Sequence, residues 1–509
     1  MVATADQIAS QAGMVAFHRG GNAVDAAIAA NAAMAVTSPH LCGLGGDLFV
    51  LVHTGRSVAA LNASGRAGSG ADPLALRAAG HSEMPFRHDI HSVTLPGCVD
   101  GWVSLHERFG SIPLADVLAP AIRIAEHGFP ASPLLVGSLA TIDDAARANL
   151  HEIAGQATHV GALVRRSGVG RTLRAVAANG RTGFYGGEFA AGLLDLGRGY
   201  FSAADLDRSQ ADWVTPLTVD AFGVRLHTIP PNSQGYLTLG GARLASEFGL
   251  PDDPHDPQWA HVLVEAATAA GYDRPEVLHE RADGVALLAA IEARSSLIDP
   301  QRASRRPSPG RAGDTTYLCT ADTHGMGVSL IQSNAAGFGS WLVEPNTGIN
   351  LHNRGIGFAL RPGHPAEYGP GRRPPHTLSP ALATRGHDLL AVFGTMGGDA
   401  QPQILLQLAA RLFHHGQSPA TAVHAGRWAL HGPQSGFDTW TAPEGPMLSV
   451  EGHAPDAWRT GLAQRGHVVH QGAAYDSAYG HAHAIVIEPS GMLVGAADPR
   501  ARVASVAAI

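Results

Sequence analysis

The chain has 509 residues, of which 45% are hydrophobic and 15% are charged, so it can form an extensive core in one or more domains. Its net charge of -8 is spread without long acidic or basic runs, which argues against a nucleic-acid partner and favours a small-molecule partner. All 35 basic residues are arginine, so chemistry that needs a lysine side chain is excluded.

The cysteines and the N-terminal residues predict a cytoplasmic protein. Cys42, Cys98 and Cys319 lie far apart and form no CxxC pair, so neither a disulfide framework nor a cysteine zinc site is expected. The first ten residues lack the basic and apolar regions of a signal peptide. No apolar run is long enough to span a bilayer, so no membrane partner is expected.

Helical and strand patterns alternate along the chain around a strand-rich centre. Residues 22–36 predict an alanine-rich helix, with Asn22 as the N-cap and Asp25 three residues later. Further helices are expected at 114–127 and 258–270, and strands at 317–321, 328–333, 389–393 and 484–488. This arrangement predicts α/β layers with mixed or antiparallel sheets.

A hairpin is expected directly after the one segment with the composition of a linker, residues 299–314. Two strand patterns flank residues 323–325, and a three-residue loop would pair Asp322 with Met326. The same register, carried back along both strands, places Thr315 opposite Ser333, although a β-bulge would shift it. The hydroxyl of Ser333 would then lie within hydrogen-bonding reach of Thr315.

Thr315 has two interpretations. Threonine is common at strand starts, and on local grounds alone this ordinary role is favoured. Alternatively, cleavage of the chain before Thr315 would free an α-amino group, whose pKa of about 7.7–8.0 suits it to activate the hydroxyl of the same residue. The flexible composition of the preceding segment makes such a cleavage geometrically feasible.

Ten segments decide between these interpretations. In chain order they are GMVAFHRGGNAVDAAIAANAAMAV, GLGGDLFVL, LNASGRAG, TLPGCVDGW, PPNSQGYLTL, GDTTYLCTADTHGMGVSLIQSN, GFGS, RRPPHTLSPAL, GTMGGDAQPQ and GAADPR. Together they resemble the γ-glutamyltranspeptidase family of N-terminal-nucleophile hydrolases over nearly the whole chain. The resemblance implies a four-layer αββα sandwich with mixed or antiparallel central sheets. It also implies autocleavage between Asp314 and Thr315 into a heavy part, 1–314, and a light part, 315–509, which remain one globular unit.

The resemblance assigns roles residue by residue. Thr315 matches the family's nucleophile, and Ser333 stands where the family has the threonine that bonds to it. Gly397 and Gly398 match the pair whose backbone N–H groups form the oxyanion hole, where the lack of a side chain allows close approach. Arg66 matches the arginine that binds the α-carboxylate of the substrate, a bidentate task that suits a guanidinium.

Departures from the family pattern concern the acyl pocket. Arg354 and Gly357 occupy the positions of the polar and acidic residues that bind the α-amino group of glutamate in transpeptidases. His376 and Thr377 replace two serines that help to hold the α-carboxylate. These changes predict a pocket for an anionic acyl group without a free α-amine, as in the acylase and amidohydrolase branch. If Arg354 instead pairs with an acidic neighbour such as Glu344, the prediction fails.

The expected activity is therefore hydrolysis of an amide of a small acid with a carboxylate or oxalyl-like end, through an acyl-enzyme. True γ-glutamyl transfer, C–C bond hydrolysis of an oxalyl-like group in a natural-product or antibiotic pathway, and an unprocessed non-catalytic binding protein remain as alternatives. The partners expected are the substrate and the protein's own heavy and light parts, with a homodimer of that pair as a further option.

No metal or organic cofactor is implied by the resemblance. His481 and His483 alternate along a predicted strand, where they could share one face as metal ligands. No third ligand stands out beside them, so a structural role is favoured.

Overall fold

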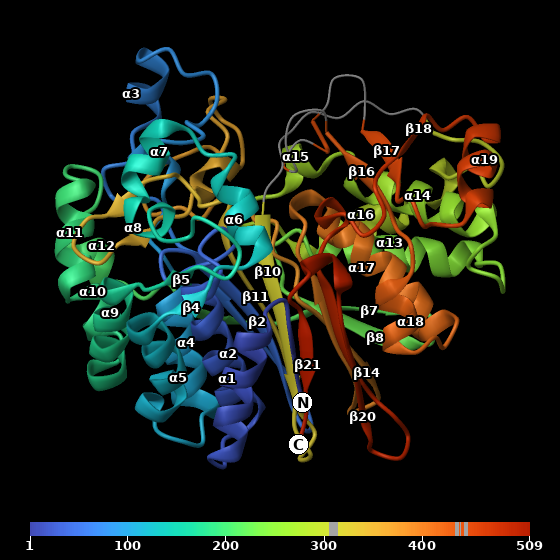
Figure 1. The fold of residues 1–509 in the computed structure, drawn as a ribbon. Coiled ribbons are helices and arrows are strands. Elements are labelled where there is room, and N and C mark those ends of the chain that lie inside the picture. Colours follow the sequence, from blue (N-terminus) through green and yellow to red (C-terminus); the bar gives the residue numbers. More distant parts are fainter. Residues whose placement is uncertain (305–313, 433–436, 438, 442–445) are drawn as a thin grey trace.

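Two antiparallel sheets lie face to face at the centre of the molecule (Figure 1). The computed structural model describes residues 1–304, 314–432, 437, 439–441 and 446–509. The first sheet has seven strands, in the order β21 (Ser505–Ala507), β1 (Val2–Thr4), β10 (Asp314–Ala321), β11 (Met326–Ala335), β2 (Asp47–Thr54), β3 (Val58–Ala63) and β6 (Asp212–Val214). The second has six, in the order β20 (Leu493–Ala497), β19 (Ala482–Ile487), β15 (Asp388–Thr395), β14 (Ala381–Arg385), β8 (Val224–Thr228) and β7 (Leu217–Ala221).

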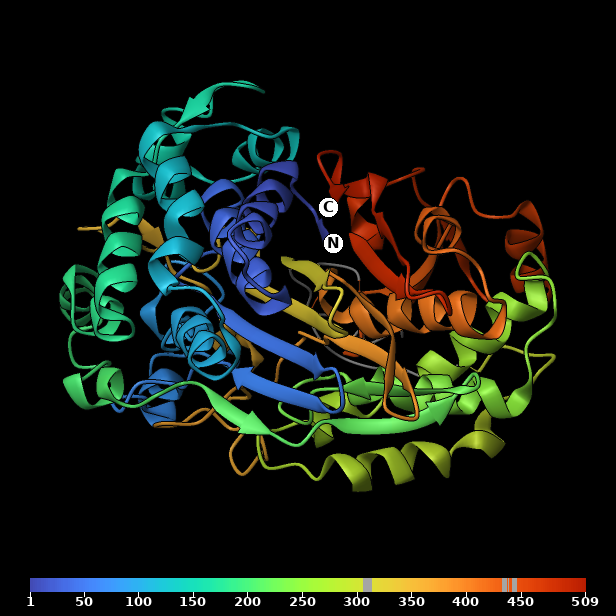
Figure 2. The same ribbon diagram turned by 90° about the horizontal axis from the view of Figure 1, so that it is seen from below.

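Helices cover the outer face of each sheet (Figures 1 and 2). The first sheet is covered by α1 (Gln7–His18), α2 (Ala23–Thr37) and α4 (Cys98–Phe109), with α5 (Leu114–His127) packed on α2. The second is covered by α13 (Tyr236–Phe248) and α17 (Gln401–Ala409), with α14 (Pro257–Gly271) and α16 (Gly284–Glu292) packed behind them. The predicted αββα sandwich is therefore confirmed, with both central sheets fully antiparallel.

Alternating side chains explain why the sheets stack in this way. Along β10, Leu318 belongs to the core beneath the helices, whereas Tyr317 and Cys319 belong to the core between the sheets. Successive side chains of a strand point to opposite faces, so a strand that is apolar on both faces must be covered on both sides. The neighbouring strand repeats the pattern, with Leu330 on the helical side and Ile331 between the sheets.

The predicted helix at 22–36 appears as α2, and its start is set by a capping box. The Asn22 side chain accepts the N–H group of Asp25, whose carboxylate accepts the N–H group of Asn22 in return. Every residue of α2 is buried. Small alanine side chains let this helix pack closely against the sheet and its neighbours, which a bulkier helix at this position could not do.

Shorter elements complete the outer layers. They are α3 (Pro73–Ala78), α6 (Pro133–Leu139), α7 (Asp144–Asn149), α8 (His151–Ala154), α9 (Ser167–Asn179), α10 (Thr182–Tyr185), α11 (Glu188–Leu196), α12 (Ala203–Asp207), α15 (Arg274–Val277), α18 (Pro419–His424) and α19 (Asp456–Gln464). Small sheets are formed by β4 (Phe129–Pro130) with β5 (Leu163–Val164), by β12 (Val343–Glu344) with β13 (Ile349–Asn350), and by β16 (Trp428–His431), β17 (Met447–Val450) and β18 (Val469–Gln471). Within the described ranges, no helix combines the length and apolar character needed to cross a membrane.

The segments before and after Thr315 share both sheets. In the first sheet, β10 lies between β1, from the start of the chain, and β11, which pairs with β2. In the second, β14 pairs with β8. The amino group of Met1 also donates to the carbonyl oxygen of Ala321 at 2.7 Å. The two parts of the chain are thus interleaved strand by strand, while the cleavage that would separate them stays a prediction.

Candidate active site

The β10–β11 hairpin has the predicted register. The N–H group of Asp322 donates to the carbonyl oxygen of Met326 at 3.0 Å, which closes the expected three-residue loop. Pairing then continues without a shift to Thr316 opposite Gln332. The long regular ladder positions the beginning of β10 firmly against the end of β11, because each residue pair is fixed by its neighbours.

A β-bulge between Asp314 and Thr316 takes Thr315 out of the ladder, yet its side chain still reaches Ser333. Thr315 Oγ1 donates to Ser333 Oγ at 3.1 Å, and both side chains are fully buried. Ser333 Oγ also accepts the N–H group of Ala335 at 2.8 Å. The Ser333 hydroxyl is therefore held by the backbone and in turn restricts the rotamer of Thr315.

Gln401 is a second polar contact of Thr315, and the sequence analysis missed it. Its amide Nε2 lies 3.5 Å from Thr315 Oγ1, and its Oε1 accepts the N–H group of Ser379 at 3.1 Å. Gln401 is the first residue of α17 and is fully buried. Gln401 lies three residues after the glycine pair, within the motif GTMGGDAQPQ, and this position was the available sign of a role near the site.

Arg354 extends this group of contacts away from Thr315. Its Nη2 lies 3.4 Å from Ser333 Oγ, and its Nη1 donates to Thr377 Oγ1 at 3.1 Å. Glu344, the alternative partner, instead accepts hydrogen bonds within its own turn, from Asn346 and Thr347. Of the predicted acyl-pocket residues, Arg354 and Thr377 are therefore brought together beside the predicted catalytic pair.

The guanidinium group of Arg354 is buried but remains a cation at neutral pH. Burial lowers its pKa to about 10, partly offset by the charges of Asp47 and Asp399, and Arg274 lowers it further. Its Nε–H group is buried without an acceptor in the described part of the chain. A buried cation with an unused donor is unfavourable by itself, and an anion that accepts from it would relieve that cost.

His376 is committed to Asp47 and not to the acyl pocket. Its Nε2 lies 3.0 Å from Asp47 Oδ2, and its Nδ1 accepts the N–H group of Leu378 at 3.3 Å. Burial lowers the pKa of His376 to about 3, and the nearby Arg354 lowers it further, so the ring is neutral. A neutral ring that accepts at Nδ1 carries its proton on Nε2 and donates it to the Asp47 carboxylate.

Asp47 connects this histidine to the strand that pairs with β11. Burial favours the neutral acid, but His352 and His376 outweigh it and hold the pKa of Asp47 below its usual value. Its Oδ1 also accepts the N–H group of Gly65 at 2.9 Å, and His352 Nδ1 lies 3.6 Å from its Oδ2. The buried carboxylate thus fixes the loop that precedes Arg66.

The side chain of Arg66 turns to a different partner. Its Nη2 pairs with Asp212 Oδ2 at 2.8 Å, and Arg373 Nη1 contacts the same oxygen at 2.6 Å. Arg66 also donates to the carbonyl oxygen of Ser209 and the side chain of Gln210. Arg66 is thus already paired with a carboxylate that it shares with Arg373, and its role in binding a substrate carboxylate stays a prediction.

The predicted oxyanion glycines lead into α17 through backbone conformations that favour glycine. Gly397 has φ +133° and Gly398 has φ +55°, and both values lie in the region that side chains disfavour. Gln234, which the sequence analysis did not single out, holds this turn: its Nε2 donates to the carbonyl oxygens of Gly398 at 2.9 Å and Thr377 at 3.0 Å. One buried amide therefore links the glycine pair to the Arg354 side of the site.

A model of the family described as Gamma-glutamyltranspeptidase matches residues 9–508. The chain belongs to this family. Within the γ-glutamyltranspeptidase family, it is 33% identical to the glutathione hydrolase-like YwrD proenzyme of Bacillus subtilis, over 98% of this chain and 97% of the relative. It is 34% identical to the oxamate amidohydrolase proenzyme of Klebsiella pneumoniae, with the same two coverages.

Solved structures agree with this placement in the γ-glutamyltranspeptidase family. The crystal structure of cephalosporin acylase from Bacillus halodurans superposes with a TM-score of 0.89 at 33% identity, over 99% of this chain and 95% of the other. The likeness to acylase and amidohydrolase members, predicted from the departures in the pocket, is thereby confirmed. The chain is an enzyme of the N-terminal-nucleophile hydrolase type.

Proposed function

We propose that this protein is a self-processing hydrolase that uses Thr315 to cleave the amide bond of a short anionic acid with an oxalyl-like acyl group. The observation that carries the proposal is the continuous contact from Arg354 through Ser333 to Thr315. It places a buried cation beside the proposed nucleophile. The names of the two bacterial relatives as proenzymes support maturation by cleavage, which here would fall between Asp314 and Thr315.

The chemistry follows from the freed N-terminus. Cleavage gives Thr315 an α-amino group, which removes the proton of its own hydroxyl as Oγ1 attacks the amide carbonyl carbon. The N–H groups of Gly397 and Gly398 stabilise the resulting oxyanion. The protonated amino group then gives its proton to the leaving amine, which departs as the acyl-enzyme ester forms. Water, activated by the same amino group, hydrolyses the ester and restores Thr315.

The length of the acyl group is limited by how close Arg354 lies to Thr315. Its Nη2 is 3.4 Å from Ser333 Oγ, which is 3.1 Å from Thr315 Oγ1. The distance from Arg354 Nη2 to Thr315 Oγ1 therefore cannot exceed the sum of these two distances. In an oxalyl amide the carboxylate carbon is bonded directly to the reacting carbonyl carbon, at about 1.5 Å. In an extended glutaryl amide the two carbons are about 5 Å apart, which fits the same space less well.

A γ-glutamyl substrate is disfavoured for a second reason. Its α-ammonium group would approach the buried guanidinium of Arg354, and two like charges at close range in a desolvated site repel strongly. Oxamate, by contrast, is the monoamide of oxalic acid and carries no ammonium group. The 34% identity to a protein named oxamate amidohydrolase supports this choice of substrate class.

A comparison of three substrates tests the proposal. Purified protein would be incubated with oxamate, with glutaryl anilide and with γ-glutamyl anilide, and release of ammonia or aniline would be measured. Oxamate is expected to give the highest kcat/KM and γ-glutamyl anilide the lowest. Efficient γ-glutamyl hydrolysis or transfer, unchanged in Arg354→Gln, would show that Arg354 does not select the substrate. An oxalyl ketone would be assayed beside these three amides, and its preferential cleavage would instead support C–C bond hydrolysis.

A further inference from the structure

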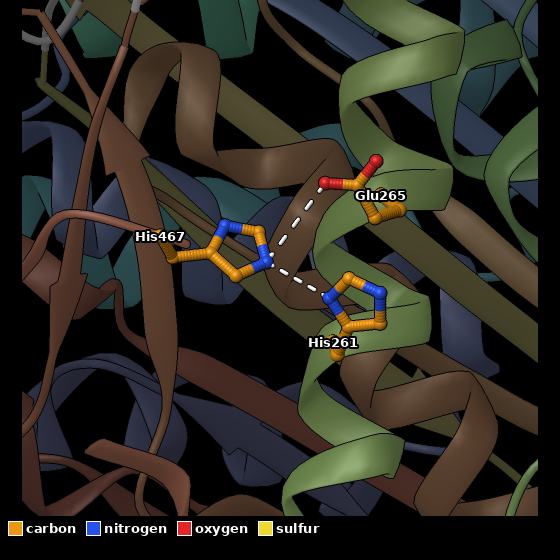
Figure 3. Close-up of side chains that lie close together, drawn as sticks. All are labelled: His261, Glu265 and His467. Atoms are coloured by element: carbon orange, nitrogen blue, oxygen red, sulfur yellow. Dashed lines mark hydrogen bonds and ion pairs between the residues drawn. The ribbon is translucent and has the colours of Figure 1, made fainter. Parts of the chain in front are cut away.

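Two histidines and a glutamate meet where α14 passes the loop that follows α19 (Figure 3). His261 Nδ1 lies 2.9 Å from His467 Nε2, and Glu265 Oε1 lies 3.8 Å from the same nitrogen. One ligand atom from each residue lies within 4.8 Å of the other two. In Figure 1, α14 and α19 lie at the right, away from β10 at the centre, so this group is separate from the candidate active site.

The helix α14 and a backbone hydrogen bond orient the side chains of this group toward one another. His261 and Glu265 are four residues apart on α14, which puts them on the same helix face. His261 Nε2 lies 2.8 Å from the carbonyl oxygen of Asp299, which can only accept, so the ring proton is on Nε2 and the Nδ1 lone pair faces the cluster. This arrangement, a ligating nitrogen opposite a donor that is held by a carbonyl, is typical of metal-binding histidines.

The two imidazole rings and the carboxylate are ligand types that a zinc ion accepts. His261 is fully buried and presents the lone pair of its Nδ1, whereas His467 directs its Nε2–H group at that nitrogen when no ion is bound. Neutral rings offer lone pairs, and the carboxylate of Glu265, which is 2% exposed, adds the negative charge.

We propose that His261, Glu265 and His467 form a binding site for a divalent transition-metal ion, with Zn²⁺ as the best match to two imidazoles and one carboxylate. A tetrahedral zinc ion about 2.0–2.1 Å from each nitrogen needs the two nitrogens about 3.3–3.4 Å apart. The rings must therefore separate by a few tenths of an ångström from their 2.9 Å contact, and Glu265 must rotate to bring its oxygen into range. Water would take the fourth position. As the ion binds, His467 changes to its other neutral tautomer, losing the Nε2 proton to solvent and taking one up at Nδ1, because Nε2 must present its lone pair.

The site joins the two parts of the chain on either side of Thr315. His261 and Glu265 precede Thr315, whereas His467 follows it. The same residues hold the segment 299–304 of the heavy part: His261 contacts the Asp299 carbonyl, and Glu265 accepts the N–H group of Ser304 at 3.1 and 3.2 Å. A metal ion here would therefore clamp the heavy part to the light part. The binding site itself does not depend on cleavage or on the identity of the substrate.

Zinc titration of the full-length protein tests the site. Protein freed of metal by dialysis against a chelator would be titrated with ZnCl₂ by calorimetry, and thermal unfolding would be recorded with and without the ion. One ion per chain and a rise in the unfolding temperature are expected, because a ligand that binds only the folded state stabilises it. Mg²⁺, which prefers oxygen ligands, should give neither effect.

Two variants and a matched control assign the ligands. His467→Ala should weaken zinc binding by at least about 10-fold and abolish the thermal shift. Glu265→Gln, which keeps an oxygen for Ser304, should weaken binding while circular dichroism shows the wild-type fold. His470→Ala changes an exposed histidine three residues away and should bind zinc like the wild type. Failure to bind one ion, or equal binding by all three variants, would overturn the proposal.

Discussion

Arg354 and Arg66 were both predicted to bind an anionic substrate, but the structure gives them different surroundings. Arg354 is buried, contacts the hydroxyls of Ser333 and Thr377, and keeps a donor without an acceptor in the described part of the chain. Arg66 forms an ion pair with Asp212, a carboxylate it shares with Arg373. An arginine that is already in direct contact with a carboxylate gains little from a second anion, whereas one whose hydrogen-bond partners are hydroxyl groups gains more.

An arginine that matches a family motif is therefore not necessarily free to bind a substrate. Arg66 follows Gly65, whose N–H group is bound by Asp47, so its backbone is held at the edge of the site while its side chain points to Asp212. Arg354 occupies a position where the family pattern predicts no cation, yet its guanidinium lies beside Ser333. We therefore expect Arg354 to contribute more to substrate binding than Arg66.

The largest effect is expected for Thr315, whose hydroxyl contacts Ser333, which in turn contacts Arg354. Thr315→Ala removes the proposed nucleophile, so hydrolysis should fall at least about 1,000-fold and the chain should stay as one band on a denaturing gel. The wild type should give two bands, with Thr315 as the first residue of the smaller. Thr315→Ser, which keeps a hydroxyl, should retain both activities in part. A wild-type chain that stays uncut and still hydrolyses substrate would contradict the mechanism.

Replacing Arg354 or Arg66 by glutamine compares the contribution of each arginine to catalysis directly. Arg354→Gln should lower kcat/KM for oxamate about 100-fold, or about 2.7 kcal/mol, because a desolvated charge contact with the substrate is lost. Arg66→Gln should lower it less than about 10-fold, because Asp212 keeps Arg373 as a partner. Steady-state kinetics of the two processed variants give the answer. The opposite ranking would return the carboxylate-binding role to Arg66.

Removal of the hydroxyl that links Thr315 to Arg354 should have a smaller effect. Ser333→Ala leaves Thr315 free to sample unproductive rotamers, so chain cleavage, turnover or both should slow by about 10-fold, within the range of about 1–3 kcal/mol for one orienting hydrogen bond. Time courses on gels and rate measurements test the two steps separately. Wild-type rates in both steps would rule out a functional pairing of these hydroxyls.

The smallest expected effect concerns how the stability of the protein depends on pH, through His376 near Arg354. His376 has its pKa lowered to about 3 by burial, so between about pH 6.5 and pH 3 the unfolded chain takes up a proton that the folded chain does not. Stability therefore falls as the pH falls through this window, by up to about 1.4 kcal/mol per pH unit for this group. His376→Asn should reduce the slope of unfolding free energy against pH between pH 4 and 6, measured in urea. An unchanged slope would show that His376 is charged in the folded protein.

Local patterns in the sequence were sufficient for the elements that depend on neighbouring residues. The capping residues Asn22 and Asp25 start α2 as predicted, and residues 114–127 form α5 within the predicted limits. The short loop at 323–325 fixed the hairpin register as far as Thr316, because antiparallel pairing from a tight loop leaves one alignment. The motifs along the chain were sufficient to identify the family, which the comparisons confirm.

The tertiary structure alone decided how polar side chains are paired. Gln234, Gln401 and Asp47 come from distant parts of the chain, and nothing in their local sequence states which buried group each will contact. The same holds for Arg66 and Arg354, whose neighbours in sequence do not reveal that one meets Asp212 and the other Ser333. Burial makes every such pairing energetically important, but the partner is chosen by how the two sheets and their loops pack, which a linear pattern does not encode.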